Sequence, residues 1–303
     1  MKQIIEVGGI RTEAFVLRAE EPVSDITLVV VPGNPGAIEF YVEFITELFH
    51  LLEQRYSIVG GHAPQQLNGD AIYTLQDQIR HKIDYLDSFG GKSRFVLMGH
   101  SVGAYISLQV TKRRPDFPIL KVINLFPTVR DLYQGLPPPV KVIMRPGLRQ
   151  LIGCIVHCIP TFVKRAILSL ARSNFDQSTR ELVTGMLKYF LFVIVIVINV
   201  LYMAYLEAYE ILDLDEDLLR HDEHEVRPTL LFLYGRTDPY TPMEFHDAMK
   251  MLMPDGHVHL AEEEVPHAFV LKHSSPVARR VAHFLEDILE HQQEVDDEEE
   301  NKA

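Results

Sequence analysis

Short apolar runs alternate with amphipathic segments along most of the chain, and this alternation predicts its secondary structure. Apolar runs rich in β-branched residues predict strands at residues 26–31, 56–60, 94–98, 120–126, 228–234 and 257–261. Helical spacing predicts helices near residues 39–54, 72–89, 104–110, 242–253 and 276–290. Residues 2–17 are typical of an antiparallel hairpin at a sheet edge. Strands alternating with helices predict an α/β fold with a mostly parallel, eight-stranded sheet.

The sequence Gly99-His-Ser-Val-Gly103 joins the predicted strand at 94–98 to the helical pattern that follows. A G-x-S-x-G between a strand and a helix is the nucleophile elbow of α/β-hydrolases, in which the serine hydroxyl stands exposed above the sheet. The two glycines leave room for the chain to pass close to itself. Ser101 is therefore the candidate nucleophile, and the alternative is an ordinary glycine-rich turn.

The loop Pro32-Gly-Asn-Pro-Gly36 follows the strand at 26–31 directly. The loop after the third strand is where this fold keeps its second oxyanion donor, and the first donor is the residue after the nucleophile. Pro35 has no N–H and cannot donate. We therefore expect the backbone N–H groups of Asn34 and Val102 to form the oxyanion hole, the alternative being a Pro/Gly turn that ends a strand.

An aspartate just past a late strand is the candidate acid. Asp238 follows the strand at 228–234 by a few residues, where its carboxylate can orient a histidine in the productive tautomer. The alternative is that Asp238 starts a turn and caps the next helix.

The chain has fourteen histidines, so position has to identify the base. His267 lies in a loop after the last strand, and Ser101, Asp238 and His267 follow the chain order of nucleophile, acid and base in this fold. His273 is the second candidate, and His259 is expected to be an exposed strand residue. This chemistry needs no metal and no organic cofactor.

Several segments carry a resemblance to a known family: Val31-Pro-Gly-Asn-Pro-Gly36 with Phe40-Tyr41 behind it, Gly99-His-Ser-Val-Gly-Ala-Tyr105, Leu125-Phe-Pro-Thr128, Tyr234-Gly-x-x-Asp-Pro239 and Val265-Pro-His-Ala-Phe269. Together they resemble the lipid droplet-associated hydrolases, over residues 26 to 290. The resemblance implies an α/β-hydrolase fold, a Ser-Asp-His triad and residence on the endoplasmic reticulum and lipid droplets. It also implies a role in hydrolysing neutral lipid or sterol esters.

Residues 1–126 and 226–290 supply the predicted core, and residues 127–225, between the sixth and seventh strands, are expected to form a cap over the site. Residues 291–303 form an acidic tail that is expected to be disordered. The formal net charge of −13 argues against nucleic acid as a partner. Residues 1–7 have no long apolar core, which favours a protein on the cytosolic face.

Part of the predicted cap is basic, although the protein as a whole is acidic. No Asp or Glu occurs from Leu132 to Phe175, whereas Lys141, Arg145, Arg149, Lys164, Arg165 and Arg172 are basic. Anionic phospholipid headgroups attract each nearby Lys or Arg by about 1 kcal/mol. We therefore expect residues 132–206 to contact the surface of a lipid droplet or of the endoplasmic reticulum.

The segment Tyr189–Leu206 is eighteen residues long and is broken only by Asn199. As a helix it would measure about 27 Å, close to the thickness of a hydrocarbon core. A single crossing would leave Ser101 and His267 on opposite sides of the membrane. The segment must then re-enter from the same side, paired with residues 151–163 as a hairpin, or be buried as the core of the cap.

Two cysteines, Cys154 and Cys158, are too few for a disulfide framework. They are four residues apart, on one face of a helix. They are either two small buried apolar residues or, in basic and membrane-facing surroundings, sites of S-acylation.

These features predict a serine hydrolase that cleaves carboxylic esters of hydrophobic lipids by an acyl-enzyme mechanism. Two alternatives remain open at this point. One is a droplet-surface or endoplasmic reticulum-surface interaction protein that keeps the fold with little turnover. The other is a soluble carboxylesterase of small esters.

Overall fold

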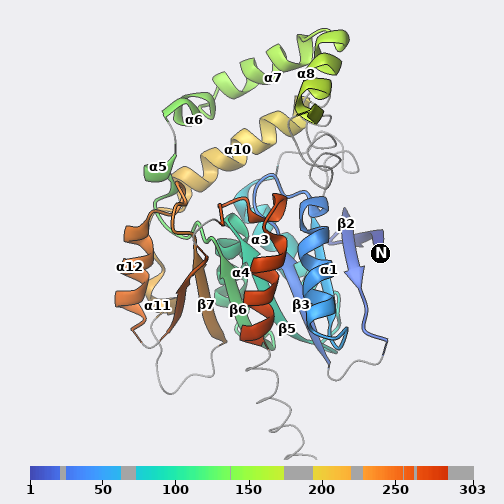
Figure 1. Cartoon of the computed structure of the whole chain (residues 1–303), viewed down its shortest axis with the longest axis vertical. Coiled ribbons are helices and arrows are strands. Elements are labelled where there is room, and N and C mark those ends of the chain that lie inside the picture. The colour runs from blue at the N-terminus through green and yellow to red at the C-terminus, as the bar shows by residue number, and fades with distance from the viewer. Residues whose placement is uncertain are drawn as a thin grey trace, which may run out of the picture.

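A computed structural model of the chain describes residues 1–20, 25–62, 73–136, 138–173, 194–219, 228–254, 256–262 and 265–285. At its centre is an eight-stranded sheet in the order β1-β2-β4-β3-β5-β6-β7-β8 (Figure 1). The strands are β1 (Lys2–Val7), β2 (Ile10–Leu17), β3 (Ile26–Val31), β4 (Ser57–His62), β5 (Arg94–His100), β6 (Ile119–Leu125), β7 (Thr229–Tyr234) and β8 (His257–Leu260). β1 and β2 pair antiparallel, as does β2 with β4, and all other pairs are parallel. The predicted fold class is confirmed.

Helices cover both faces of the sheet, so its central strands are apolar on both sides. In β3, Leu28 and Val30 pack with η1 (Ile38–Tyr41), α1 (Val42–Leu51) and the helix at residues 274–285. The alternate residues Val29 and Val31 pack on the other face, with α3 (Leu75–Asp87), α4 (Val102–Arg113) and α12 (Met243–Leu252). Successive strand residues point to opposite faces, which is why one strand contributes to two cores.

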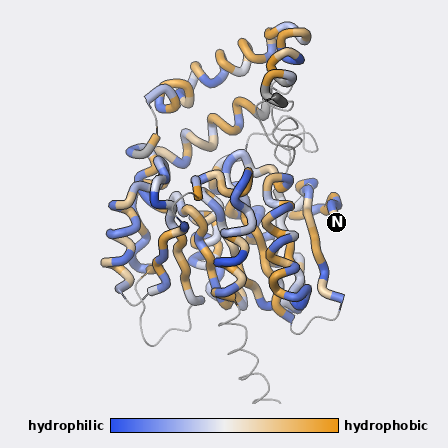
Figure 2. Tube along the Cα trace, viewed as in Figure 1, coloured by the Kyte–Doolittle hydropathy of each residue, from blue (hydrophilic) through white to orange (hydrophobic). Residues whose placement is uncertain are grey.

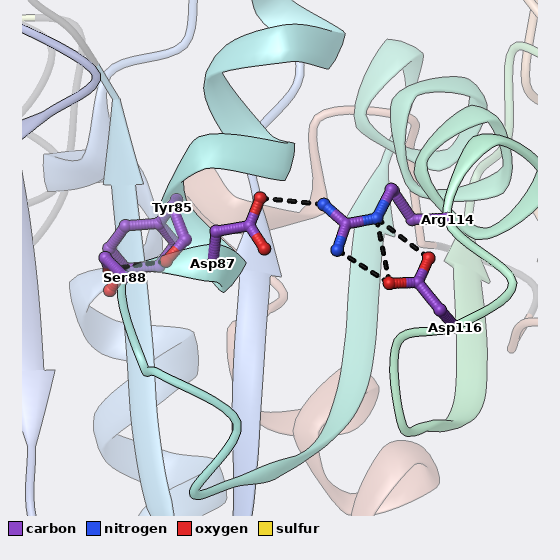
Figure 3. A network of polar contacts seen from close by, with 5 residues as sticks. All are labelled: Tyr85, Asp87, Ser88, Arg114 and Asp116. Carbon is purple, nitrogen blue, oxygen red and sulfur yellow. Dashed lines mark hydrogen bonds and ion pairs between the residues drawn. The ribbon is translucent and has the colours of Figure 1, made fainter.

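Arg114 joins the ends of α3 and α4 at the edge of the sheet where the parallel strands begin. Its guanidinium donates to Asp87 at 2.7 Å and to Asp116 at 2.7 Å (Figure 3), and it lies 3.8 Å from the ring centroid of Phe117. These groups are partly exposed to solvent, so the ion pairs add little to stability. Their effect is to fix the turn into β6, at the opposite end of β5 from Ser101.

A helical insertion lies between β6 and β7. It comprises α5 (Leu132–Gly135), α6 (Pro138–Ile143), α7 (Leu148–Cys158), α8 (Thr161–Ser173), α10 (Ile194–Glu210) and α11 (Glu216–Leu219). In Figure 1, α10 lies between α7 and the edge of the sheet where the parallel strands end, and α7 and α8 form the outer layer. The insertion therefore covers the edge at which the loops after β3, β5, β7 and β8 converge.

α10 contains most of the apolar segment for which the sequence left two interpretations. Met203 and Leu206 are buried in the same core cluster as α4, and α7 packs against α10 as well. The guanidinium of Arg149 on α7 lies 4.5 Å from the ring centroid of Tyr202 on α10. This segment therefore packs against protein through Met203 and Leu206. Residues 189–193 lie outside the described residues.

The outer layer of the insertion exposes apolar side chains instead. Leu151 and Ile155 on α7 are 53% and 55% exposed, and Phe162 on α8 is 74% exposed. Figure 2 shows apolar residues running along both helices. Within the described residues no single helix has the length and apolar composition to cross a membrane, whereas α7 with the following part of α8, bent by 98°, has them as a pair.

Two expectations about the insertion need correction. Cys154 and Cys158 are both exposed on α7, so the interpretation of two buried apolar residues is wrong. The predicted basic surface is also smaller than its sequence suggests. Lys164 is buried, with its ammonium group 3.0 Å from the carbonyl oxygen of His157. The guanidinium of Arg149 packs over the ring of Tyr202 on α10 and so is turned toward protein. The predicted acidic tail at 291–303 lies outside the described residues.

Candidate active site

Ser101 stands at the sharp turn between β5 and α4, with φ 55° and ψ −124°. A positive φ is uncommon for a residue other than glycine and stores strain in the backbone. The turn brings backbone so close that a Cβ at Gly103 would lie 2.1 Å from the carbonyl oxygen of Val31, and one at Gly99 would lie 2.3 Å from that of Gly103. Both positions therefore require glycine. This is the geometry of a nucleophile elbow.

The three predicted triad residues lie together above the sheet. Nε2 of His267 is 2.9 Å from Oγ of Ser101, and its Nδ1 is 2.6 Å from Oδ2 of Asp238. Because the carboxylate accepts a hydrogen bond from Nδ1–H, Nε2 is left without a proton and can accept the hydrogen bond of the serine hydroxyl. The residues come from loops after β5, β7 and β8, and His267 is 166 residues from Ser101 in sequence.

Asp238 is held by its own loop. Its Oδ1 accepts hydrogen bonds from the backbone N–H groups of Tyr240 at 2.8 Å and Thr241 at 3.4 Å. Its Oδ2 accepts a bond from the hydroxyl of Thr241 at 2.9 Å, in addition to the one from His267. The side chain of Asp238 is fully buried. These bonds leave only one orientation for the carboxylate, with Oδ2 toward the histidine.

Aromatic rings enclose the imidazole of His267. Its ring centroid lies 4.7 Å from that of Tyr240, 5.3 Å from that of His100 and 6.2 Å from that of Phe126. The side chain of His267 nevertheless remains 14% exposed. The packing fixes the plane of the ring while leaving it accessible from one side.

The loop after β3 lies directly against the elbow. A Cβ built at Gly33 would lie 2.9 Å from Cβ of Ser101. The next residue, Asn34, uses its side-chain amide to donate to the carbonyl oxygen of Val200 at 3.0 Å and to Oε1 of Glu207 at 3.2 Å, both on α10. Val102, the other predicted oxyanion donor, is the first residue of α4, and the first backbone N–H groups of a helix have no partner within the helix and suit the binding of an anion.

Three buried polar residues near Ser101 were not predicted. Tyr41 and His100 form a hydrogen-bonded pair beside the triad, and Glu207 faces Asn34 from the insertion. Burial raises the pKa of Glu207 to about 8, and the bond from Asn34 only partly opposes this rise. His100 was visible as part of the elbow motif. Nothing in the local pattern separates Glu207 from other acidic residues, because its burial depends on the packing of α10.

The other candidate histidines lie elsewhere. Nδ1 of His259 on β8 is 3.1 Å from the guanidinium of Arg280, and burial lowers the pKa of His259. The backbone N–H of His273 donates to the carbonyl oxygen of Phe269 at 2.7 Å, just before the helix that begins at Ser274. Among the described residues, no group of three or more His, Cys, Asp or Glu is arranged to hold a metal ion.

The chain is similar in sequence to known proteins over most of its length. The family model described as lipid-droplet associated hydrolase matches residues 24–270. A lipid droplet-associated hydrolase from Dictyostelium discoideum is 39% identical over 294 residues, covering 92% of this chain and 93% of that protein.

Solved structures with the same fold come from enzymes of different activities. The haloalkane dehalogenase DatA from Agrobacterium tumefaciens has a TM-score of 0.69 at 15% identity, covering 95% of this chain and 97% of its own. A serine hydrolase from Cycloclasticus zankles has a TM-score of 0.65 at 15% identity, covering 95% of this chain and 98% of its own. Identity this low shows the fold alone. The protein has the α/β-hydrolase fold, and with the match over residues 24–270 it belongs to the lipid-droplet associated hydrolase family.

Proposed function

We propose that the protein is a serine hydrolase that cleaves carboxylic esters of hydrophobic lipids. The observation that carries the proposal is the continuous line of hydrogen bonds from Ser101 through His267 to Asp238, at 2.9 and 2.6 Å. Distances in this range suit proton transfer between a nucleophile and its base. The names of the relatives, which describe hydrolases of lipid droplets, add support from outside the geometry.

In the proposed reaction, Nε2 of His267 takes the proton of Ser101 as Oγ attacks the ester carbonyl. The imidazolium that forms is stabilised by the carboxylate of Asp238 at its other nitrogen. His267 then returns the proton to the departing alcohol. Water attacks the resulting acyl-enzyme with His267 again as base, which releases the carboxylic acid and restores Ser101.

The negative charge that develops on the carbonyl oxygen needs donors close to Ser101. The N–H of Gly33 is occupied, because it donates to the hydroxyl of Tyr41 at 2.8 Å. We assign the oxyanion hole to the backbone N–H groups of Asn34, in the loop after β3, and of Val102, the residue after the nucleophile. Removal of one such donor typically costs about a hundredfold or more in rate.

The insertion at residues 127–225 acts, in this proposal, as a cap that admits an apolar ester. α10 covers the catalytic edge and is apolar over most of its length. This favours sterol esters or other neutral lipid esters over small soluble esters as substrates.

The outer face of the cap supports attachment to a lipid surface. Leu151 and Ile155 on α7 and Phe162 on α8 expose large apolar side chains, and the nearby Arg145 and Arg165 are exposed cations. Exposed apolar groups beside cations suit the interface of an anionic phospholipid layer. We propose that this face binds the cytosolic side of a lipid droplet or of the endoplasmic reticulum.

Labelling with a fluorophosphonate probe tests the catalytic part of the proposal, because the probe reacts only with an activated serine. We expect rapid labelling of the wild type, and none of Ser101→Ala or His267→Ala. Ser107→Ala, a buried serine on α4, and His273→Ala, the second candidate base, are the matched controls and should label normally. Absence of labelling in a folded wild type would refute turnover and favour an interaction protein.

A comparison of substrates tests the lipid part. A cholesteryl or triacylglycerol ester in an emulsion coated with phospholipid should be cleaved faster than a short soluble ester at equal ester concentration. Faster cleavage of the soluble ester, with the protein remaining in the supernatant, would instead identify a small-ester carboxylesterase.

A further inference from the structure

A chain of buried hydrogen bonds connects the loop after β3 to the loop that carries His267. The backbone N–H of Gly33 lies 2.8 Å from the hydroxyl oxygen of Tyr41. That oxygen lies 2.7 Å from Nδ1 of His100, and Nε2 of His100 lies 2.9 Å from the carbonyl oxygen of His267. His100, which immediately precedes Ser101, is part of this chain of hydrogen bonds, but none of the three bonds involves the serine hydroxyl.

The direction of every bond in this chain follows from its two ends. The carbonyl oxygen of His267 can only accept, so Nε2 of His100 must carry the hydrogen. Nδ1 of a neutral histidine then accepts, and the hydroxyl of Tyr41 donates to it. The oxygen of Tyr41 in turn accepts from Gly33, whose N–H can only donate. All four groups are satisfied in one arrangement.

The surroundings keep both side chains neutral. Burial, with a smaller contribution from the nearby charge of His267, lowers the pKa of His100 to about 3. Burial also raises the pKa of Tyr41 well above its usual value. The ring of His100 packs edge-on against Phe126 and Phe269, with centroids 6.2 and 5.0 Å apart. Hydrogen bonds in such an apolar environment are stronger than in water, and an unpaired group there is costly.

We infer that Tyr41 and His100 are positioning residues, which hold the oxyanion loop and the loop of the catalytic histidine at a fixed distance from each other. The inference rests on the proposed function. Oγ of Ser101 must reach the carbonyl carbon of the ester while the N–H of Asn34 binds the carbonyl oxygen and Nε2 of His267 takes the serine proton. Because these groups belong to three loops far apart in sequence, a link between two of the loops preserves their common geometry. Misplacement by about 1 Å can cost a hundredfold in rate.

Tyr41→Phe is the sharpest variant, since it removes one oxygen atom and leaves the ring in the core. It deprives Gly33 of its acceptor and His100 of its donor. We expect the second-order rate of fluorophosphonate labelling to fall roughly ten- to hundredfold. With a p-nitrophenyl ester, kcat should fall by a similar factor while KM stays within about twofold, because substrate binding does not use the displaced groups.

Tyr85→Phe is the matched control. Tyr85 is a buried tyrosine on α3 that packs through Phe89 onto Phe95, at the start of β5 and away from Ser101. If the role of Tyr41 is only to stabilise the core, both variants will have a lower melting temperature than the wild type, and both will keep the wild-type labelling rate. Positioning requires that Tyr41→Phe alone slows labelling.

Two variants of His100 separate its hydrogen bond to His267 from its hydrogen bond to Tyr41. The amide of His100→Gln can still donate toward the carbonyl of His267, and the amide oxygen of His100→Asn can still accept from Tyr41. Each should retain more activity than His100→Ala, and a double variant with Tyr41→Phe should be non-additive. Fully additive effects would mean that the two residues act independently, which contradicts the inference.

The labelling experiment distinguishes the failure of each proposal. If the folded wild type does not label, the proposed hydrolase function fails and this inference falls with it. If the wild type labels and Tyr41→Phe labels at the same rate, only the positioning role of the pair is refuted.

Discussion

The side-chain amide of Asn34 donates a hydrogen bond to the carboxyl group of Glu207 at 3.2 Å, and so joins the loop beside Ser101 to helix α10 of the insertion. Glu207 is 3% exposed, and burial raises its pKa to about 8. A carboxyl group in this environment is protonated near neutral pH. The insertion and the loop after β3 are thus connected through a group that loses its proton only in mildly alkaline solution.

The raised pKa of Glu207 predicts how stability depends on pH. The unfolded glutamate titrates near 4.5 and the folded one near 8, so the native state binds the extra proton between these values. The contribution of Glu207 to stability is complete below pH 4.5 and is lost as pH rises through about 8, by at most about 1.4 kcal/mol per pH unit.

Glu207→Gln should remove this dependence, because glutamine keeps the acceptor for Asn34 and does not ionise. The difference in unfolding free energy between the variant and the wild type should then grow from pH 5 to pH 8 and remain constant above it. Urea unfolding at several pH values measures this. Glu210→Gln, an exposed glutamate on the same helix, should show no such trend. Parallel curves for Glu207→Gln and wild type would contradict the prediction.

Asp238→Asn should nearly abolish labelling without unfolding the protein. The backbone N–H groups of Tyr240 and Thr241 require an acceptor at Oδ1, so the new amide nitrogen must occupy the Oδ2 position. It then donates to Nδ1 of His267, which moves the ring proton to Nε2 and leaves no acceptor for Ser101. A loss of roughly 10⁴-fold follows from the wrong tautomer.

The control for this variant is Asp247→Asn, an exposed carboxyl on α12. It should leave the rate of labelling unchanged. Retention of more than a tenth of the wild-type rate in Asp238→Asn would mean that this carboxylate does not orient the base.

The exposed face of α7 and α8 should control binding to lipid droplets. Burying one large apolar side chain contributes about 1.5–3 kcal/mol. Replacing Leu151, Ile155 and Phe162 together with serine should therefore weaken binding to droplets with a triolein core and an anionic phospholipid coat by at least a hundredfold, measured by flotation.

Met251→Ser is the matched control, since Met251 is 84% exposed on α12. Its binding should equal that of the wild type. All variants should keep their rate of fluorophosphonate labelling in solution, because the exposed face contacts none of the catalytic groups. Undiminished flotation of the triple variant would show that the lipid-binding surface lies elsewhere on the protein.

Cys154 and Cys158 remain predicted sites of S-acylation, and their exposure on α7 makes both thiols accessible. Their position beside Leu151 and Ile155 would place an attached acyl chain in the same lipid layer. Metabolic labelling with palmitate should give a hydroxylamine-sensitive signal in the wild type and none in the double serine variant. A wild type without that signal would refute the prediction.

Local pattern in the sequence was sufficient for the order of the elements and for the elbow. Strand and helix periods follow from backbone geometry within a few residues, so β3 and β5 could be placed before any tertiary contact was known. The same holds for Gly99 and Gly103, because the close approach that requires them occurs within a single turn. The rules of the fold then restricted Asp238 and His267 to the loops after the last strands.

Only the tertiary structure decided which distant groups meet. The separation of 2.9 Å between Ser101 and His267 depends on how three loops converge at one edge of the sheet. The pairing of Tyr41 with His100 and the burial of Glu207 depend on the same convergence and on the packing of α10. Hydropathy cannot distinguish the interior of a protein from the interior of a lipid layer, since both are apolar. For that reason the long apolar segment was ambiguous in sequence, whereas in the structure α10 packs against the core through Met203 and Leu206, and α7 carries the exposed apolar face.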